Sequence, residues 1–396
     1  MPYFDHAAST PICDEAFEAM QPYLRGEFGN PSSLHHLGRN AKHAVEVARE
    51  QVAALLGARP AEIVFNSGAT EGNNHAIKGV AHRFREKGRH IVTSEIEHDA
   101  VLHPCQALER DGYEVTYVGV GSDGIVKLDE LEAALRGDTI LVSLMHANNE
   151  MGTLQPLEET AALCRERGIL LHCDACQTAG HIPINVKTLG VDLLTLSGHK
   201  LYGAKGAGAL YIRRGVRLET LIDGGTQQKG RRAGTENVAS IVSLGVASMV
   251  ALESMHNGEE QHVAALRDRL IAGIEKEVTG AHLNGDRERR VPGIVNFSFA
   301  GVEGEGLILE LDARGGFCLS TGSACAAGSL DPSPVLLAIG LEVGLARAGT
   351  RFSLGRHNTE AEVDALVELL PRVISSLRNL SPESRITACA IEASRT

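Results

Sequence analysis

Residues 169–200 read ILLHCDACQTAGHIPINVKTLGVDLLTLSGHK. This stretch holds two short β-rich runs, Ile169–Cys173 and Val191–Leu196, and each run ends in polar residues. DACQ (174–177) follows the first run, and SGHK (197–200) follows the second. Apolar runs of this length are typical of strands that are buried in a parallel sheet. The stretch therefore predicts two buried strands with reactive side chains at their carboxyl ends.

Further β-rich runs extend this pattern on both sides: Glu62–Phe65, His90–Thr93, Glu114–Val118, Thr139–Leu144 and Ala209–Ile212. Amphipathic segments lie between most of the runs, for example Leu128–Arg136 and Leu157–Arg167. Upstream, apolar residues three and four positions apart predict one face of a helix: Ala41, Val45, Ala48, Val52 and Leu55. This alternation predicts an α/β fold with a mainly parallel sheet covered by helices on both faces.

The pattern changes from about Leu252. A charged helical stretch, Glu259–Val278, precedes short strands at Ile294–Phe299 and Arg351–Leu354, and the last helix, Glu360–Leu377, follows an N-cap at Thr359. We therefore predict a large α/β domain of residues 16–250. Residues 1–15 together with 251–396 form the predicted smaller α+β domain, which carries a cysteine-containing segment at about 318–330.

The composition limits the classes of function. Of the 396 residues, 43% are hydrophobic and 22% are charged, as in an ordinary globular protein. With 38 Lys and Arg against 50 Asp and Glu, the net charge of −12 disfavours direct binding to nucleic acid. No apolar run is read as long enough to span a bilayer, and we expect no membrane partner. Eight Cys are too few for a disulfide scaffold, and no targeting peptide is evident, so we expect a cytoplasmic protein.

Polar residues follow several of the predicted strands. NSGATEG (66–72) comes after the first strand and opens a predicted helix. Its small residues would let an anion approach the backbone N–H groups at the start of the helix. A simple turn with a helix cap is the alternative interpretation. HANNE (146–150) follows the fourth strand. Open α/β sheets bind ligands beyond the carboxyl ends of their strands, so these segments are candidates for one site with 174–177 and 197–200.

Lys200 and Asp174 would place an amine and a carboxylate at this edge of the predicted sheet. A lysine at a strand end is usually solvated, but Lys200 stands between Ser-Gly-His and Leu-Tyr-Gly, and a desolvated lysine can bond to an aldehyde. A phosphate cradle, a carboxylate and such a lysine fit pyridoxal 5′-phosphate. Asp174 would keep the ring nitrogen of this cofactor protonated, and Lys200 would hold its aldehyde.

Six motifs resemble those of cysteine desulfurases of the NifS/IscS type: SGATE (67–71), EH (97–98), NNE (148–150), SGHKLYG (197–203), GTEN (234–237) and STGSAC (320–325). The resemblance runs from FDHAA (4–8) to RFSLGR (351–356), which is nearly the whole chain. It implies a pyridoxal phosphate-dependent transferase of fold type I, with a large domain built on a mainly parallel sheet and a smaller α+β domain. It also implies a homodimer.

The resemblance assigns roles around the cofactor. Lys200 is implied to hold the aldehyde, Asp174 to pair with the ring nitrogen, and Gln177 to contact the ring hydroxyl. His98 is implied to stack on the ring and to assist proton transfer. The residues implied to hold the phosphate are Ala69, Thr70, Ser197, His199 and the partner subunit's Thr235.

The same resemblance assigns the substrate contacts. Asn149 matches the site asparagine beside cofactor and substrate, and Arg351 matches the arginine that binds the substrate carboxylate. The planar fork of an arginine pairs with both oxygens of a carboxylate. An ion pair within the small domain is the other interpretation of Arg351. Arg356 is the nearest competing residue, and we favour Arg351.

Cys325 is the predicted nucleophile. It lies in Ser320–Gly328, a run of small residues that bury little surface, so its thiol could move between cofactor and acceptor; a buried, inert cysteine is the alternative. Cys173 and Cys176 form a Cys-x-x-Cys pattern that is also typical of redox or zinc sites. No second ligand pair with metal spacing follows, so we predict no metal site. Strand alternation turns Cys173 away from Asp174, toward the core.

Two departures from the family pattern lie beside the predicted site. GTQQK (225–229) replaces a Gly-Gly-Gln-Glu-like run, and Ala204 stands where a proline is common. We expect both departures to affect subunit contacts and the stiffness of loops more than the chemistry of the site. Gly203–Gly208 has a weak dinucleotide-binding pattern, but it precedes a predicted strand instead of opening a helix.

These residues predict an enzyme that converts L-cysteine to L-alanine. The sulfur would pass to Cys325 as a persulfide and then to a sulfur-acceptor protein, for the biosynthesis of iron–sulfur clusters or related sulfur compounds. A selenocysteine lyase or an aminotransferase of the same fold is the near alternative, although transamination needs no thiol. A non-catalytic sulfur or iron–sulfur scaffold is the alternative from another class, and it would not need Lys200.

Overall fold

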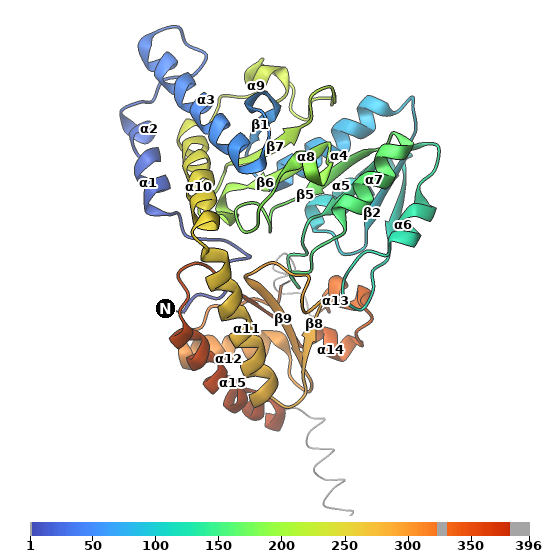
Figure 1. Cartoon of the computed structure of the whole chain (residues 1–396), viewed down its shortest axis with the longest axis vertical. Coiled ribbons are helices and arrows are strands. Elements are labelled where there is room, and N and C mark those ends of the chain that lie inside the picture. Colours follow the sequence, from blue (N-terminus) through green and yellow to red (C-terminus); the bar gives the residue numbers. More distant parts are fainter. Residues whose placement is uncertain (1, 323–330, 381–396) are drawn as a thin grey trace, which may run out of the picture.

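The computed structural model describes residues 2–322 and 331–380. Figure 1 shows two units that are stacked along the long axis of the molecule, the upper one built on a large sheet and the lower one on a small sheet. The predicted nucleophile, Cys325, lies outside the described residues.

The large sheet has the strand order β1-β7-β6-β5-β4-β2-β3. Its strands are β1 (Ile63–Asn66), β2 (His90–Ser94), β3 (Glu114–Val118), β4 (Thr139–Met145), β5 (Leu170–Asp174), β6 (Leu193–Ser197) and β7 (Gly208–Ile212). Strands β3, β2, β4, β5 and β6 pair in parallel, whereas β7 is antiparallel to both β6 and β1. The mainly parallel sheet is confirmed, and each predicted run in this part of the chain forms one of its strands.

Helices cover both faces of the large sheet, because successive strand residues point to opposite sides. On β1, Val64 packs in a cluster with α4 and α5, whereas Ile63 and Phe65 pack in a second cluster with α3, α7 and α10. The helices of this unit are α1 (Asp14–Met20), α2 (Pro22–Arg25), α3 (His36–Leu56), α4 (Ala69–Phe84), α5 (Asp99–Arg110), α6 (Leu128–Ala134), α7 (Leu157–Arg167), α8 (Val186–Leu189), α9 (Gln227–Gly230) and α10 (Val238–His256).

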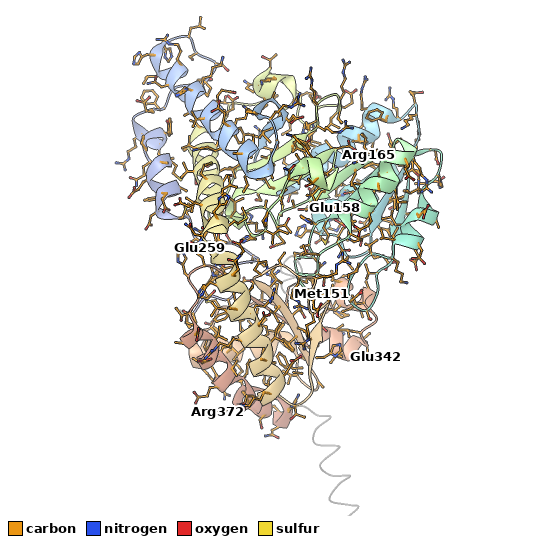
Figure 2. All side chains as sticks on the ribbon, in the orientation of Figure 1. Met151, Glu158, Arg165, Glu259, Glu342 and Arg372 are labelled. Atoms are coloured by element: carbon orange, nitrogen blue, oxygen red, sulfur yellow. The ribbon has the colours of Figure 1, made fainter. Side chains whose placement is uncertain are left out.

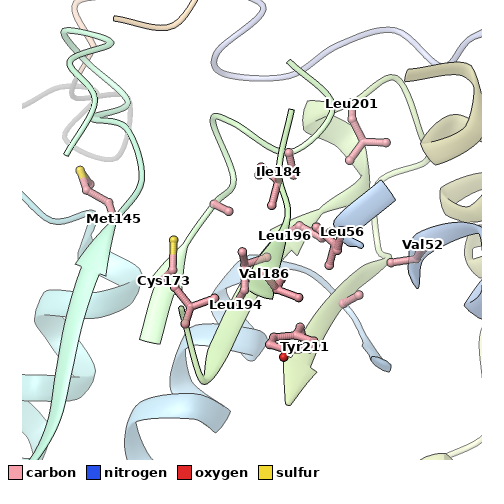
Figure 3. Packing of buried hydrophobic residues seen from close by; sticks show 14 of the residues in the cluster. Val52, Leu56, Met145, Cys173, Ile184, Val186, Leu194, Leu196, Leu201 and Tyr211 are labelled. Atoms are coloured by element: carbon pink, nitrogen blue, oxygen red, sulfur yellow. The ribbon is translucent and has the colours of Figure 1, made fainter. Parts of the chain in front are cut away.

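The second cluster contains Cys173. Its side chain is fully buried among apolar residues of β5, β6 and the helices beside them, as Figure 3 shows. The prediction that strand alternation turns Cys173 toward the core is confirmed. Burial also raises the pKa of this thiol well above its ordinary value, so the thiol stays protonated and unreactive.

The lower unit is a three-stranded antiparallel sheet with helices packed on it. Its strands, in the order β10-β9-β8, are β8 (Ala281–Asn284), β9 (Ile294–Phe299) and β10 (Gly349–Ser353), and its helices are α11 (Glu259–Glu277), α12 (Gly304–Gly315) and α15 (Glu360–Leu380). Thr359 caps α15 as predicted, because its Oγ1 accepts a hydrogen bond from the backbone N–H of Glu362 at 3.3 Å.

Two segments link the units. Phe4, near the N-terminus, is buried in the core of the lower unit, and α13 (Pro334–Ala338) and α14 (Val343–Arg347) place Val335, Leu336 and Ala346 in a cluster of the large sheet. Hence α13 and α14 contact both units, since α14 also packs against β9. The domain boundaries 1–15, 16–250 and 251–396 stay a prediction.

Helix α10 corrects one expectation from the sequence. By length and composition it is apolar enough to cross a membrane, so the statement that no apolar run has that length was wrong. Its residues Ile241, Val242 and Leu244 are buried in the cluster that includes α3. A helix that is apolar on most sides is also typical of a protein core, and the packing of α10 against α1 and α3 fits that interpretation.

Candidate active site

A cavity of about 420 Å³ opens where β1, β4, β5 and β6 end. Because β1, β4, β5 and β6 run in the same direction, their carboxyl ends lie at one edge of the sheet, as the sequence predicts. The cavity is lined by every predicted cofactor residue except Thr235, namely Ala69, Thr70, His98, Asn149, Asp174, Gln177, Ser197, His199 and Lys200.

The phosphate cradle is the start of α4. Gly68 precedes this helix with φ of +149°, a conformation that favours glycine, and a Cβ on Gly208 would lie 2.7 Å from the Gly68 Cα. The two glycines therefore let two backbone segments approach each other at the cavity wall. The first N–H groups of α4 have no partner within the helix and carry the positive end of its dipole, which suits a phosphate.

Asp174 lies at the end of β5 with an exposed fraction of 7%. Its Oδ2 accepts a hydrogen bond from Asn73 Nδ2 at 2.6 Å, and its Oδ1 accepts one from the backbone N–H of Cys176 at 3.0 Å. Both donors are uncharged, so they orient the carboxylate without neutralising it. A carboxylate held in this way can pair with a protonated ring nitrogen. The sequence interpretation missed Asn73, which lies far away in the chain.

Lys200 ends a short 3-10 turn, Gly198–Lys200, that follows β6. Its Nζ donates hydrogen bonds to the backbone carbonyls of Ala7 at 2.5 Å and Ala8 at 2.9 Å. Burial lowers the pKa of Lys200, which increases the share of neutral, nucleophilic amine. The enclosure predicted from the flanking residues is therefore present, and the N-terminal segment contributes to it.

His98 is the N-cap of α5, and its Nδ1 accepts a hydrogen bond from the backbone N–H of Ala100 at 3.0 Å. This bond occupies the lone pair of Nδ1 and leaves Nε2 as the ring nitrogen that carries or exchanges a proton. His98 lines the cofactor cavity and also a neighbouring cavity of about 320 Å³. It is therefore placed to contact groups in both.

Arg351 lines the neighbouring cavity together with Lys200 and Asn149. This residue of β10 is only 2% exposed. Its Nη2 pairs with Asp5 Oδ1 at 2.9 Å, and its Nη1 donates to the backbone carbonyl of Asn149 at 2.8 Å. The pair with Asp5 is the ion pair that the sequence offers as the other interpretation of Arg351, and the structure contains it. The same guanidinium lies at the wall of a space next to Lys200, where a substrate carboxylate would compete with Asp5 for it.

Arg356 occupies a different environment. Its guanidinium carbon lies 3.9 Å from the centroid of the Tyr202 ring, and its Nε lies 3.8 Å from Glu259 Oε2. It lines another cavity, beside His181 and α11, which neither Lys200 nor Asp174 borders. The geometry favours Arg351 over Arg356 as the substrate arginine.

Replacing Arg351 with alanine is expected to raise the KM for the amino-acid substrate by about tenfold to a hundredfold, because charge-assisted hydrogen bonds to the carboxylate are lost. Steady-state kinetics measure this change, and the cofactor spectrum should stay unaltered. Arg356→Ala is the matched control and should leave KM unchanged. A normal KM in Arg351→Ala, or a larger effect in Arg356→Ala, would reverse the assignment.

The structure leaves two predicted site residues without a test. Thr235 is exposed and lies outside the cavity of this chain, so its contact with the partner subunit's phosphate site stays a prediction. Cys325 lies outside the described residues.

Cys176 lines the cofactor cavity beside Asp174, which the sequence interpretation did not consider. Burial raises the pKa of its thiol well above the ordinary value. Such a thiol is a poor nucleophile. Within residues 2–322 and 331–380, no group of three or more His, Cys, Asp or Glu is arranged to hold a metal ion.

The residues of the cavity fit pyridoxal phosphate. A helix N-terminus with a glycine cradle, an oriented carboxylate and a desolvated lysine all border one space, and these are the partners for a phosphate, a ring nitrogen and an aldehyde. The volume of about 420 Å³ lies in the range usual for cofactor sites.

Comparisons with known proteins agree with this chemistry. The family model of aminotransferase class V matches residues 2–366. The chain is 50% identical over 380 residues to the cysteine desulfurase IscS of Dictyoglomus turgidum, with 96% of each protein covered. A solved NifS-like protein superposes with a TM-score of 0.88 at 39% identity, covering 94% of this chain and 99% of the other. The structure of SspA in complex with cysteine gives a TM-score of 0.79 at 38% identity, covering 91% and 100%.

The chain belongs to the aminotransferase class-V family, whose fold type I enzymes depend on pyridoxal phosphate. Within that family it belongs to the cysteine desulfurases. The fold class, the cofactor and the family predicted from the sequence are therefore confirmed.

Proposed function

We propose that this protein takes L-cysteine as substrate, releases L-alanine and passes the sulfur through Cys325 to a thiol of an acceptor protein. The observation that carries the proposal is the pair of adjoining cavities at the sheet edge. One is bordered by Asp174 and the other by Arg351, and Lys200 borders both. A space bordered by an arginine thus adjoins a half-buried amine, which supports the binding of an amino acid there.

When it is bound, pyridoxal phosphate supplies an aldehyde that reacts with amines and a ring that takes up negative charge. Asp174, oriented by Asn73, stabilises the proton on the ring nitrogen. Arg351 binds the substrate carboxylate and so orients the substrate Cα toward Lys200. The Lys200 amine, which burial keeps partly neutral, then moves the proton at Cα, and His98 assists through Nε2.

Sulfur transfer needs a nucleophile, and STGSAC (320–325) supplies Cys325. Its thiolate attacks the substrate sulfur, so that an S–S bond forms while the Cβ–S bond breaks, and the electron pair with a proton ends on Cβ. L-cysteine and a thiol thereby give L-alanine and a persulfide, and no external oxidant is needed. A thiol of the acceptor then attacks the outer sulfur of the persulfide.

The proposal includes a cytoplasmic homodimer and an acceptor protein that serves iron–sulfur cluster assembly or a related sulfur pathway. The 50% identity to a cysteine desulfurase IscS supports this choice of pathway. The exposed position of Thr235, outside the cavity of its own chain, supports a contact with the partner subunit.

Side-by-side assays of the purified holoenzyme test the function. With L-cysteine and a reductant, we expect alanine and sulfide in equal amounts. L-selenocysteine and an amino acid paired with a keto acid are the comparison substrates. Turnover of L-selenocysteine without turnover of L-cysteine would assign a selenocysteine lyase, and amino-group transfer to the keto acid as the main reaction would assign an aminotransferase.

A further inference from the structure

The Asp5 carboxylate is paired with Arg351 but has no part in the proposed chemistry. Arg351 extends from β10 of the lower unit, and its Nη1 donates a hydrogen bond to the backbone carbonyl of Asn149 at 2.8 Å. Met151 belongs to the same turn as Asn149, and Figure 2 shows Met151 where the two units of the molecule meet. Asp5 approaches from the N-terminal segment, and its Oδ1 accepts a hydrogen bond from Nη2 of Arg351 at 2.9 Å. The ion pair therefore lies at the junction of the two units.

These contacts satisfy the guanidinium of Arg351 only in part. Nε and Nη2 form one edge of the planar group, and a carboxylate can accept hydrogen bonds from both at once. Asp5 uses one oxygen, on Nη2, whereas Nε is buried and has no hydrogen-bond partner within residues 2–322 and 331–380. A buried N–H group without a partner costs free energy. This edge of Arg351 therefore has a place for the second oxygen of a carboxylate.

The ion pair lies beside the amine of the cofactor site. Arg351 lines a cavity of about 320 Å³ together with Lys200. The N-terminal segment that carries Asp5 also supplies the carbonyls of Ala7 and Ala8, which accept hydrogen bonds from Lys200 Nζ at 2.5 Å and 2.9 Å. An amino acid that reacts near Lys200 would therefore present its carboxylate to the space that Arg351 borders.

The two partners differ in what they can do when the pair opens. The side chain of Arg351 is 2% exposed, whereas that of Asp5 is 20% exposed. A buried cation needs a counter-ion, because removing its partner leaves an uncompensated charge. The backbone of Asp5 is held in place, since its carbonyl accepts a hydrogen bond from the N–H of Ala8 at 3.0 Å. The Asp5 carboxylate can thus turn toward water by rotation of its side chain, whereas Arg351 stays at the cavity wall.

We propose that Asp5 is a positioning residue, which holds the carboxylate-binding edge of Arg351 in the free enzyme and yields it to the carboxylate of the amino-acid substrate. A carboxylate that accepts from both Nε and Nη2 forms two charge-assisted hydrogen bonds where Asp5 forms one, so it can displace Asp5. Asp5 pairs with Arg351 again when the product leaves. Its competition lowers the affinity for substrate and product alike and speeds the release of L-alanine. This role rests on the proposed function, in which Arg351 binds the substrate carboxylate.

Spectral titration of the holoenzyme measures this competition without any sulfur transfer. L-alanine, the proposed product, carries the amine and the carboxylate but no thiol, and its Kd is obtained from the change in the cofactor spectrum. In Asp5→Asn a neutral amide competes less well for Arg351, so the Kd for L-alanine should fall about tenfold, the scale of one hydrogen bond to a charged group. Ethylamine is L-alanine without the carboxylate, and its Kd should stay unaltered. A merely structural role of Asp5 would not separate these two ligands.

Glu95→Gln is the matched control, because it removes a negative charge that borders the same cavity as Arg351, whereas Glu95 is exposed and forms no ion pair with Arg351 in the described part of the chain. This variant should behave as wild type. In the Arg351→Ala background, the addition of Asp5→Asn should not change the Kd for L-alanine further. An unchanged or higher Kd in Asp5→Asn would overturn the proposal, as would an equal fall for ethylamine or a fall that persists without Arg351.

Asp5→Ala carries the test if Asp5→Asn does not fold. L-alanine should raise the Tm of this variant more than that of the wild type, because the ligand supplies the missing partner of Arg351, and an equal or smaller rise would contradict the role of Asp5. Alanine release from L-cysteine by the wild type separates this proposal from the one on which it rests. Absence of that release would overturn the proposed function itself. Normal release by the wild type with an unchanged Kd in Asp5→Asn would overturn only the role of Asp5.

Discussion

Replacing Lys200 with alanine is expected to abolish the yellow absorbance band of the holoenzyme and to lower alanine production from L-cysteine by about 10²–10⁴-fold, the usual contribution of a positioned general base. Lys200 is the amine of the cofactor cavity that is hydrogen-bonded to the carbonyls of Ala7 and Ala8 and desolvated by burial. An absorption spectrum of the protein purified with added cofactor is the first measurement, and an alanine assay is the second.

Lys205→Ala is the matched control, because Lys205 also lines this cavity but its side chain is exposed. Lys205→Ala should keep both the absorbance band and the activity. This result would show that the defects of Lys200→Ala do not come merely from the loss of a positive charge near the cavity. Retention of the band in Lys200→Ala, or its loss in Lys205→Ala, would contradict the assignment of Lys200. Refolding defects are recognised separately by far-UV circular dichroism.

The strands were predictable because a strand that is buried on both faces appears in the sequence as a short, mostly apolar run. Runs such as Thr139–Leu144 are mostly apolar, and the corresponding strand, β4, is buried at every position. The structure shifts β6 to Leu193–Ser197, later than the predicted start at Val191, because Val191 and Asp192 lead into the strand as loop residues. Strand β8 was missed, since it is partly exposed and its four residues, AHLN, are too few for their alternation of apolar and polar side chains to distinguish it from a loop.

The candidate site was predictable in part for a topological reason. Parallel strands place their carboxyl ends at one edge, so Asp174 and Lys200 could be brought together from the order of the strands alone. Asn73, Ala7 and Ala8 could not, because their contacts with those residues join segments far apart in the sequence. The spacing of residues carries no information on such contacts, and a backbone carbonyl has no sequence signature at all.

The contacts of Glu150 show the same limit. In the NNE motif the resemblance assigns a role to Asn149 and none to Glu150. Only the fold reveals that Ser333 and Gly322 meet at this carboxyl group, since they come from opposite sides of a segment more than 170 residues downstream (322 − 150 = 172). A buried carboxyl group needs polar partners, and the fold supplies one for Glu150 in the Ser333 hydroxyl.

Cys325→Ala is expected to separate the two halves of the proposed reaction. L-cysteine should still perturb the cofactor spectrum, because Asp174, Lys200 and Arg351 are intact. Alanine release should fall on the order of 10³-fold or more, as is usual when a nucleophile is removed, since no thiolate takes the substrate sulfur. Rapid mixing with spectral detection measures the first half, and a quenched alanine assay measures the second.

Cys318→Ala is the matched control for the loss of a thiol. Cys318 lies seven residues before Cys325 (325 − 318 = 7), is half-buried, and has a pKa raised by burial, so its thiol is poorly suited to act as a nucleophile. Full alanine release by Cys325→Ala would remove this cysteine from the mechanism, and a loss in Cys318→Ala alone would move the nucleophile there. If both variants lost the spectral change as well, the segment would act in substrate binding, and sulfur transfer would need another acceptor thiol.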